Sequence, residues 1–193
     1  MEIKQNKLVI RQKIEALEIF TDFETKNKYQ IEDKSGNQIF YAYEESGFFT
    51  RHFLGSIRPT KIIIIDNNKK PLLTIEKDIH FIRANYKIKD PSDNLIGEIK
   101  QKKWMMNPSF EVFDSGNNLL YTCQSKVPHI WTYNIFKDGN QVGQILKKWA
   151  GGREVFTDAD KFYVDFGSIS NQIEKQLILG AAFAIDLRMF EHK

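Results

Sequence analysis

Cysteine is almost absent from this chain of 193 residues, in which Cys123 is the only one. A single thiol cannot form an intrachain disulfide or a cysteine-based metal cluster, and this composition favours a reducing, intracellular setting. Residues 1–7 also lack the apolar run of a signal peptide, so we expect a protein that is not secreted. A chain of this length buries enough surface to fold without disulfides or a structural metal. We expect one domain over residues 1–193 with its core at about 7–190.

A strong excess of one charge is missing too, since 28 Lys and Arg residues face 25 Asp and Glu residues for a net charge of +3. This excess does not favour nucleic acid as a partner, although it does not exclude it. With 41% hydrophobic and 27% charged residues, a disordered or fibrous chain is excluded. The sequence contains no paired-carboxylate, triad or nucleotide-binding signature, and its four histidines have no ligand spacing, so we expect no enzyme.

Short segments rich in isoleucine and aromatic residues alternate with turn signals, which indicates a mainly β protein. Aspartates that open turn sequences recur at positions 66, 90, 114 and 138, which are 24 residues apart. Another turn signal begins at Asp33. This spacing favours a meander or barrel of about a dozen strands over a parallel sheet. The predicted strands include residues 38–43, 61–66, 72–75, 86–88, 110–113, 132–136 and 162–166.

Two lysine-rich segments look like copies of each other. Residues 97–104 (GEIKQKKW) match residues 143–149 (GQILKKW) with one residue deleted. They indicate two related halves of one β structure, and chance similarity in a lysine-rich chain is the alternative.

The C-terminal segment predicts a helix over about residues 171–190, which Asn171 caps with Glu174 in the first turn. Residues 177–185 contain no polar side chain on any face, so this helix must be buried. The run is about 13 Å long, whereas a bilayer core is about 30 Å thick, and we expect a helix inside a protein core. Asp186 and Arg188 are expected where the helix emerges. The predicted core residues of the helix are Leu177, Ile178, Ala181, Ala182, Phe183 and Ile185.

Several segments together resemble the phospholipid scramblase family, in the family's order and across nearly the whole chain. They are residues 23–29, 50–51, 58–59, 64–67, 153–162 and 179–186. The resemblance implies a twelve-stranded, tubby-like closed β-barrel that encloses a hydrophobic C-terminal α-helix. It also implies calcium-dependent, ATP-independent movement of phospholipids in both directions across bilayers. The family's palmitoylated cysteine cluster has no counterpart, so we expect a cytoplasmic monomer that meets the plasma membrane peripherally.

The family's proposed calcium segment corresponds to residues 158–169. Asp158 and Asp160 supply carboxylates there, but Phe162 and Ile169 stand where a calcium loop needs oxygen ligands. This pattern predicts weak calcium binding at best, and a polar turn before a strand is the alternative. Asp165 is expected to face solvent on that strand.

Cations next to tryptophan in the repeated segments predict contact with anionic lipid headgroups. The residues are Lys102, Lys103, Trp104, Lys147, Lys148 and Trp149. An ordinary solvated barrel face is the alternative. The function expected from the resemblance is phospholipid movement or binding at a membrane surface. The alternative function is a soluble tubby-like module that binds anionic headgroups, nucleic acid or a protein partner without moving lipids.

Overall fold

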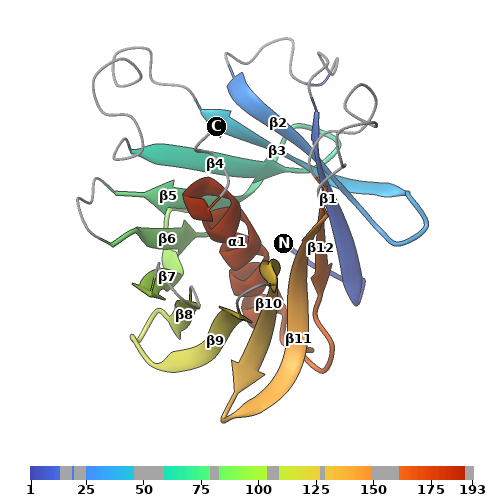
Figure 1. Cartoon of the computed structure of the whole chain (residues 1–193). Helices are drawn as coiled ribbons and strands as arrows, with labels where there is room; N and C mark the ends of the chain where they lie inside the picture. Colours follow the sequence, from blue (N-terminus) through green and yellow to red (C-terminus); the bar gives the residue numbers. More distant parts are fainter. Residues whose placement is uncertain are drawn as a thin grey trace.

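Twelve antiparallel strands form a closed barrel around one helix in the computed structural model of the protein (Figure 1). The structure describes residues 1–13, 19, 25–45, 59–78, 83–103, 109–126, 129–148 and 161–189. The strands are β1 (Lys7–Lys13), β2 (Thr25–Glu32), β3 (Gln38–Glu45), β4 (Thr60–Ile65), β5 (Pro71–Lys77), β6 (Asn85–Lys89), β7 (Leu95–Lys103), β8 (Ser109–Asp114), β9 (Leu119–Lys126), β10 (His129–Lys137), β11 (Asn140–Lys148) and β12 (Lys161–Asp165). The helix is α1 (Gln172–Met189).

Each strand pairs with its neighbours in the sequence, and β1 pairs with β12 to close the ring. Figure 1 shows β1 and β12 side by side at this closure, with α1 inside the ring of strands. The predicted architecture, a mainly β, twelve-stranded closed barrel around a hydrophobic C-terminal helix, is therefore confirmed. The short strand segments predicted from isoleucine and aromatic content coincide with strands of the barrel.

Four hairpins at one end of the barrel use the same aspartate-led turn. The carboxylates of Asp33, Asp66 and Asp90 each accept backbone N–H groups from the residues two and four positions further on. Asp114 accepts from the backbone of Asn118 in the same way. The fourth residue of each turn has positive φ, as a tight hairpin of this kind requires (Gly36, Lys69, Asp93 and Asn117). These turns are the ones predicted at positions 33, 66, 90 and 114.

The Asp90 turn is expected to lose stability when its carboxylate is removed or protonated. Hydrogen bonds from Asn94 and Ser92 lower the pKa of Asp90 below its usual value of 3.8. A lowered folded-state pKa means that the stabilisation is present above the unfolded pKa and is lost as the pH falls through the folded pKa. Asp90→Ala should lower the thermal midpoint at pH 7, and the gap to the unsubstituted protein should narrow below about pH 3.9. Ser92→Ala, which keeps the backbone donor, should leave the midpoint unchanged, and a gap independent of pH would contradict this account.

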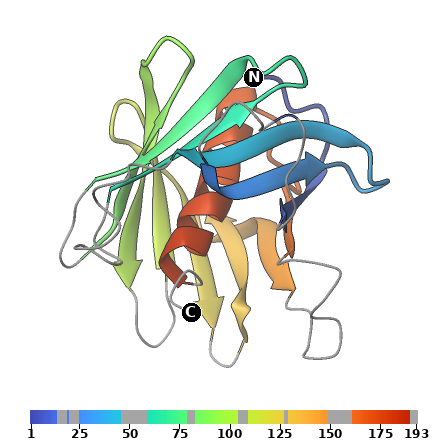
Figure 2. The ribbon, with the colours of Figure 1, turned by 90° about the horizontal axis from the view of Figure 1, so that it is seen from above.

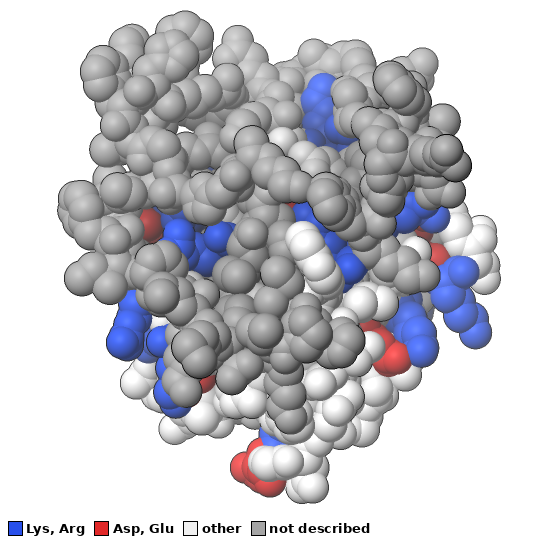
Figure 3. Space-filling view, in the orientation of Figure 1, with Lys and Arg blue, Asp and Glu red and all other residues white. Residues whose placement is uncertain are grey.

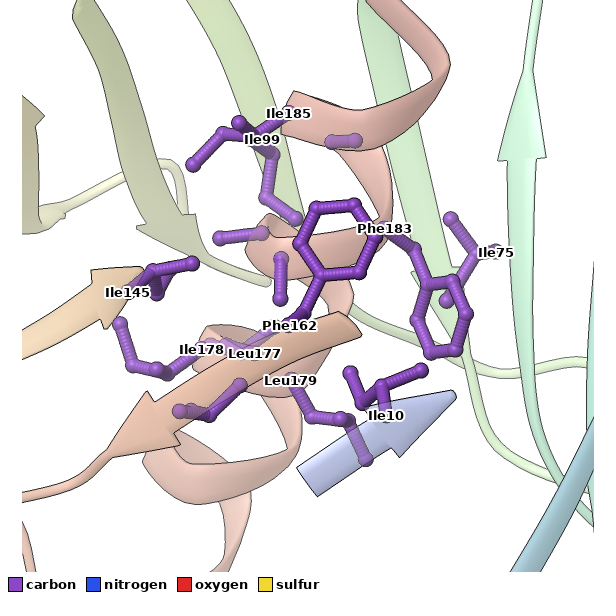
Figure 4. Packing of buried hydrophobic residues seen from close by; sticks show 14 of the residues in the cluster. Ile10, Ile75, Ile99, Ile145, Phe162, Leu177, Ile178, Leu179, Phe183 and Ile185 are labelled. Atoms are coloured by element: carbon purple, nitrogen blue, oxygen red, sulfur yellow. The ribbon is translucent and has the colours of Figure 1, made fainter. Parts of the chain in front are cut away.

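The core lies between α1 and the inward side chains of the strands. Figure 2 shows the helix running through the barrel, and Figure 4 shows Phe183 and Phe162 packed among isoleucines and leucines from helix and strands. The predicted core positions on α1 are all buried: Leu177, Ile178, Ala181, Ala182, Phe183 and Ile185. Burial of this apolar surface drives both helix formation and barrel closure, because neither element covers its apolar face alone.

Two glycines let the helix approach the barrel wall closely. A Cβ at Gly97 on β7 would lie 2.2 Å from the carbonyl oxygen of Phe113 and 2.8 Å from Leu177 of the helix. A Cβ at Gly180 would lie 2.7 Å from Ile88 on β6. Any larger side chain at these positions would push α1 away from β6 and β7.

The N-terminal residues hold the first turns of α1. Asn171 caps the helix as predicted, since its side chain accepts the backbone N–H groups of Ile173 and Glu174. The buried Lys175 donates to the carbonyls of Ile3 and Gln5 at 3.2 and 3.1 Å. The apolar run of the helix therefore begins directly beneath a layer of satisfied polar groups.

Candidate functional site

The lysine-rich segments predicted to contact lipid lie on β7 and β11, where successive side chains alternate between the barrel interior and its outer face. On β7 the inward residues are Ile99 and Gln101, both buried. On β11 the inward residues are Ile145 and Lys147, which are also buried. The alternation therefore places Lys100 and Lys102 on the outer face of the barrel and Lys147 in its interior.

The outward lysines of β7 take part in charged contacts on the surface. Lys102 pairs with Glu111 of β8. Lys100 lies 3.0 Å from Glu98 and 2.7 Å from the side-chain oxygen of Asn117, with its amine 4.4 Å from the centre of the Phe113 ring. Figure 3 shows Lys and Arg side chains at several separate places on the face in view, some with an Asp or Glu beside them. The side chains of Lys100 and Lys102 are 36% and 56% exposed, although those of Glu98 and Glu111 are only 20% and 17% exposed, so both amines are accessible to a lipid phosphate.

Lys147 corrects the prediction of a surface cation. Its side chain is only 4% exposed, and its amine lies 3.2 Å from the Asp186 carboxylate of the helix. The amine also lies 4.7 Å from the centre of the Phe162 ring. The physical reason is the alternation of β11: Ile145 points inward, so the residue two positions later must point inward too. Lys147 cannot contact a lipid headgroup from this position.

Asp186 also differs from the prediction that the helix emerges there. Its side chain is 7% exposed, and besides Lys147 it accepts the hydroxyl of Tyr29 at 3.5 Å. Arg188 donates to the side-chain oxygen of Gln101 at 2.9 Å. The buried Asp186 therefore has a charged partner on β11, and the half-buried Arg188 has a polar partner on β7.

The two repeated segments place their polar residues equivalently when aligned without a gap at Gly97 and Gly143. The fourth residue after each glycine points inward and contacts the last turns of α1: Gln101 contacts Arg188, and Lys147 contacts Asp186. An alignment on Trp104 and Trp149 needs a deletion, which pairs Lys147 with the outward Lys102 and hides this correspondence. The two-residue period of a strand, counted from Gly97 and Gly143, places Gln101 and Lys147 on the same inward face.

The remaining predicted site residues fall at or beyond the edge of the described chain. Lys103 and Lys148 lie at the ends of β7 and β11. Trp104, Trp149, Asp158 and Asp160 lie outside the described residues. Within the described ranges no group of three or more His, Cys, Asp or Glu side chains could hold a metal ion.

The structure also places Asp165 and Cys123. Asp165 pairs with Lys7 on the outer face, as expected for a solvent-facing strand residue, at 2.7 Å. Cys123 is fully buried, and burial raises the pKa of its thiol to about 12. A thiol with so high a pKa is not a nucleophile at neutral pH.

No helix among the described residues combines the length and the apolar content needed to cross a bilayer.

Comparison with known proteins gives the family. The Scramblase family model matches residues 2–192. Phospholipid scramblase 1 of Mus musculus is 30% identical over 96% of this chain and 61% of its own length. Phospholipid scramblase 2 of Bos taurus is 30% identical over 96% of this chain and 69% of its own. Among solved structures, a protein from Arabidopsis thaliana is similar with a TM-score of 0.48 and 13% identity, over 94% of this chain and 93% of that one.

The chain thus spans about three fifths of the length of the mouse relative, and it covers 63% of phospholipid scramblase 1 of Homo sapiens at 30% identity. The match of the family model extends over nearly all of the chain, from the N-terminal segment to the end of the helix. The chain belongs to the scramblase family.

Proposed function

We propose that this protein binds phospholipids at a membrane surface through the outer face of its barrel, and that it promotes their movement between leaflets from there. The observation that carries the binding part of the proposal is the burial of residues 177–185, whose apolar side chains pack against the barrel wall and leave the outer face for lipid. Membership of a family named for phospholipid scrambling supports lipid as the substrate. Because the apolar side chains of α1 already pack inside the barrel, we expect outward side chains such as Lys102 to contact the lipid.

A binding module that does not move lipid is the second candidate. The same burial favours it, because a helix held in the barrel offers no path for a headgroup through a bilayer. For both candidate functions, we propose that the protein lies in the cytoplasm and attaches peripherally to the plasma membrane. Calcium would act through Asp158 and Asp160, whose two carboxylates suit weak binding of a hard cation.

Vesicles containing phosphatidylserine and a fluorescent phospholipid test both proposals in one preparation. The protein is expected to cosediment with them, and to release more inner-leaflet label to external dithionite than protein-free vesicles do. Calcium should increase this release, and Asp158→Asn with Asp160→Asn should remove the increase. Lys102→Ala, Lys103→Ala and Lys148→Ala together should weaken cosedimentation by roughly fivefold for each lysine that touches the surface.

Lys61→Ala on β4 is the matched control, since it removes one outward lysine with a similar ion pair, to Glu45 at 3.2 Å. Cosedimentation with dithionite release no faster than in empty vesicles would reject lipid movement and retain the binding module. If neither the triple substitution nor added salt reduces the amount of protein that cosediments, the basic residues of β7 and β11 are not the membrane contact.

A further inference from the structure

Strands β11, β12 and β1 lie side by side where the barrel closes (Figure 1), and the register of their outward residues is ordered. Strand register places Val9, Tyr163 and Leu146 opposite one another, and we call these three the apolar row. Lys7, Asp165 and Gln144 form the next row on one side. Arg11, Lys161 and Lys148 hold the corresponding positions on the other side.

A groove of about 300 Å³ lies over this face. The apolar row supplies its floor, and Lys7 and Lys34 are among its lining residues. Lys34 comes from the turn between β2 and β3, a hairpin that projects outward next to β1 in Figure 1. Leu146 and Tyr163 are half-buried and Val9 is only 8% exposed, so Leu146 and Tyr163 supply most of the apolar surface that a ligand could contact.

The charges around the groove favour an anion. Lys34 is exposed and forms no ion pair with any residue that the structure describes. Lys7 is paired with Asp165, but its side chain is 59% exposed and can bind a second acceptor. Two lysines and the Asp165 carboxylate therefore surround an apolar floor, and the net positive charge is complementary to a molecule with a phosphate next to hydrocarbon.

We propose that this groove binds one anionic phospholipid, with its phosphate at Lys7 and Lys34 and its first acyl carbons on the apolar row. The volume supports this occupant, because small-ligand sites measure about 300–1,000 Å³ and a groove at the lower limit takes a headgroup and the first few carbons of each chain. The rest of the acyl chains would stay in the membrane. The proposal rests on the proposed function and adds to it a lipid site on the side of the barrel opposite β7, separate from Lys102.

Dihexanoylphosphatidylserine, used below its micelle concentration, is the probe, and calorimetric titration measures its affinity. Lys34→Glu is expected to weaken binding by roughly tenfold, since it replaces a cation at the phosphate with a repelling anion. Leu146→Gln, which leaves the charges unchanged, should weaken binding through the floor. Lys70→Glu is the matched control, because it makes the same charge change in the β4–β5 turn at the same end of the barrel.

Glycerophosphoserine, which has the headgroup without acyl chains, separates a lipid site from an anion site. It is expected to bind at least tenfold more weakly than the short-chain lipid, through loss of the apolar contact. Equal affinities of the two probes would overturn the proposal, as would equal effects of Lys34→Glu and Lys70→Glu. Cosedimentation that survives while the short-chain lipid fails to bind would reject the groove and leave the proposed function standing.

Discussion

Ala182→Asp is expected to prevent the chain from folding. Ala182 lies in the middle of the apolar run of α1 and is 1% exposed, with the barrel wall around it. A carboxylate there would lose its hydration without gaining a partner, and an unpaired buried charge costs several kcal/mol. Domains of this kind are stable by only about 5–15 kcal/mol, and the larger side chain adds overpacking to the electrostatic cost.

Ile173→Asp is the matched control on the same helix. Ile173 is 51% exposed and lies in the first turn, where a negative charge suits the helix dipole. This variant should retain its near-ultraviolet circular dichroism and its thermal midpoint, whereas Ala182→Asp should lack both a folded spectrum and a cooperative transition. A folded Ala182→Asp protein with an unchanged midpoint would show that the helix is not enclosed.

The barrel could be predicted from the sequence because its signals are local. Isoleucine-rich runs such as residues 61–66 favour strands, and each Asp-led turn satisfies its own backbone within five residues. The enclosed helix was equally predictable, since residues 177–185 have no face that water could solvate. Membership of the family agrees with both.

Lys147 and Asp186 were misplaced for the opposite reason. Charged residues are almost never fully buried unless they are paired, so a lysine in a basic segment was assigned to the surface. The partner that reverses this preference lies 39 residues away on another element. Only the register of β11 and the position of the helix bring the two charges together.

The groove on β1, β12 and β11 depends still more on tertiary structure. Val9 and Tyr163 become neighbours through the pairing that closes the barrel, which joins the two ends of the sheet. Neither residue belongs to a recognisable motif. Their shared row could not be inferred before the order and register of the strands were known.

Lys147→Met is expected to destabilise the protein by about 3–5 kcal/mol, because it leaves the Asp186 carboxylate buried beside an apolar side chain. Asp186→Leu should cost a similar amount by stranding the Lys147 amine. The double variant Lys147→Met with Asp186→Leu should recover most of the loss, since two apolar side chains of similar volume need no partner. Urea unfolding of the four proteins gives the free energies and the coupling between the two sites.

The exposed pair of Lys61 and Glu45 is the control, because it shows how much stability an ion pair contributes when it is not buried. It joins β4 to β3 at 3.2 Å, with side chains 40% and 54% exposed, so Lys61→Met should cost about 1 kcal/mol or less. A large loss at Lys147 together with recovery in the double variant would identify desolvation as the reason the two charges need each other. Additive losses would instead mean that Lys147 and Asp186 contribute through separate contacts, and the ion pair would not hold the end of α1 to β11.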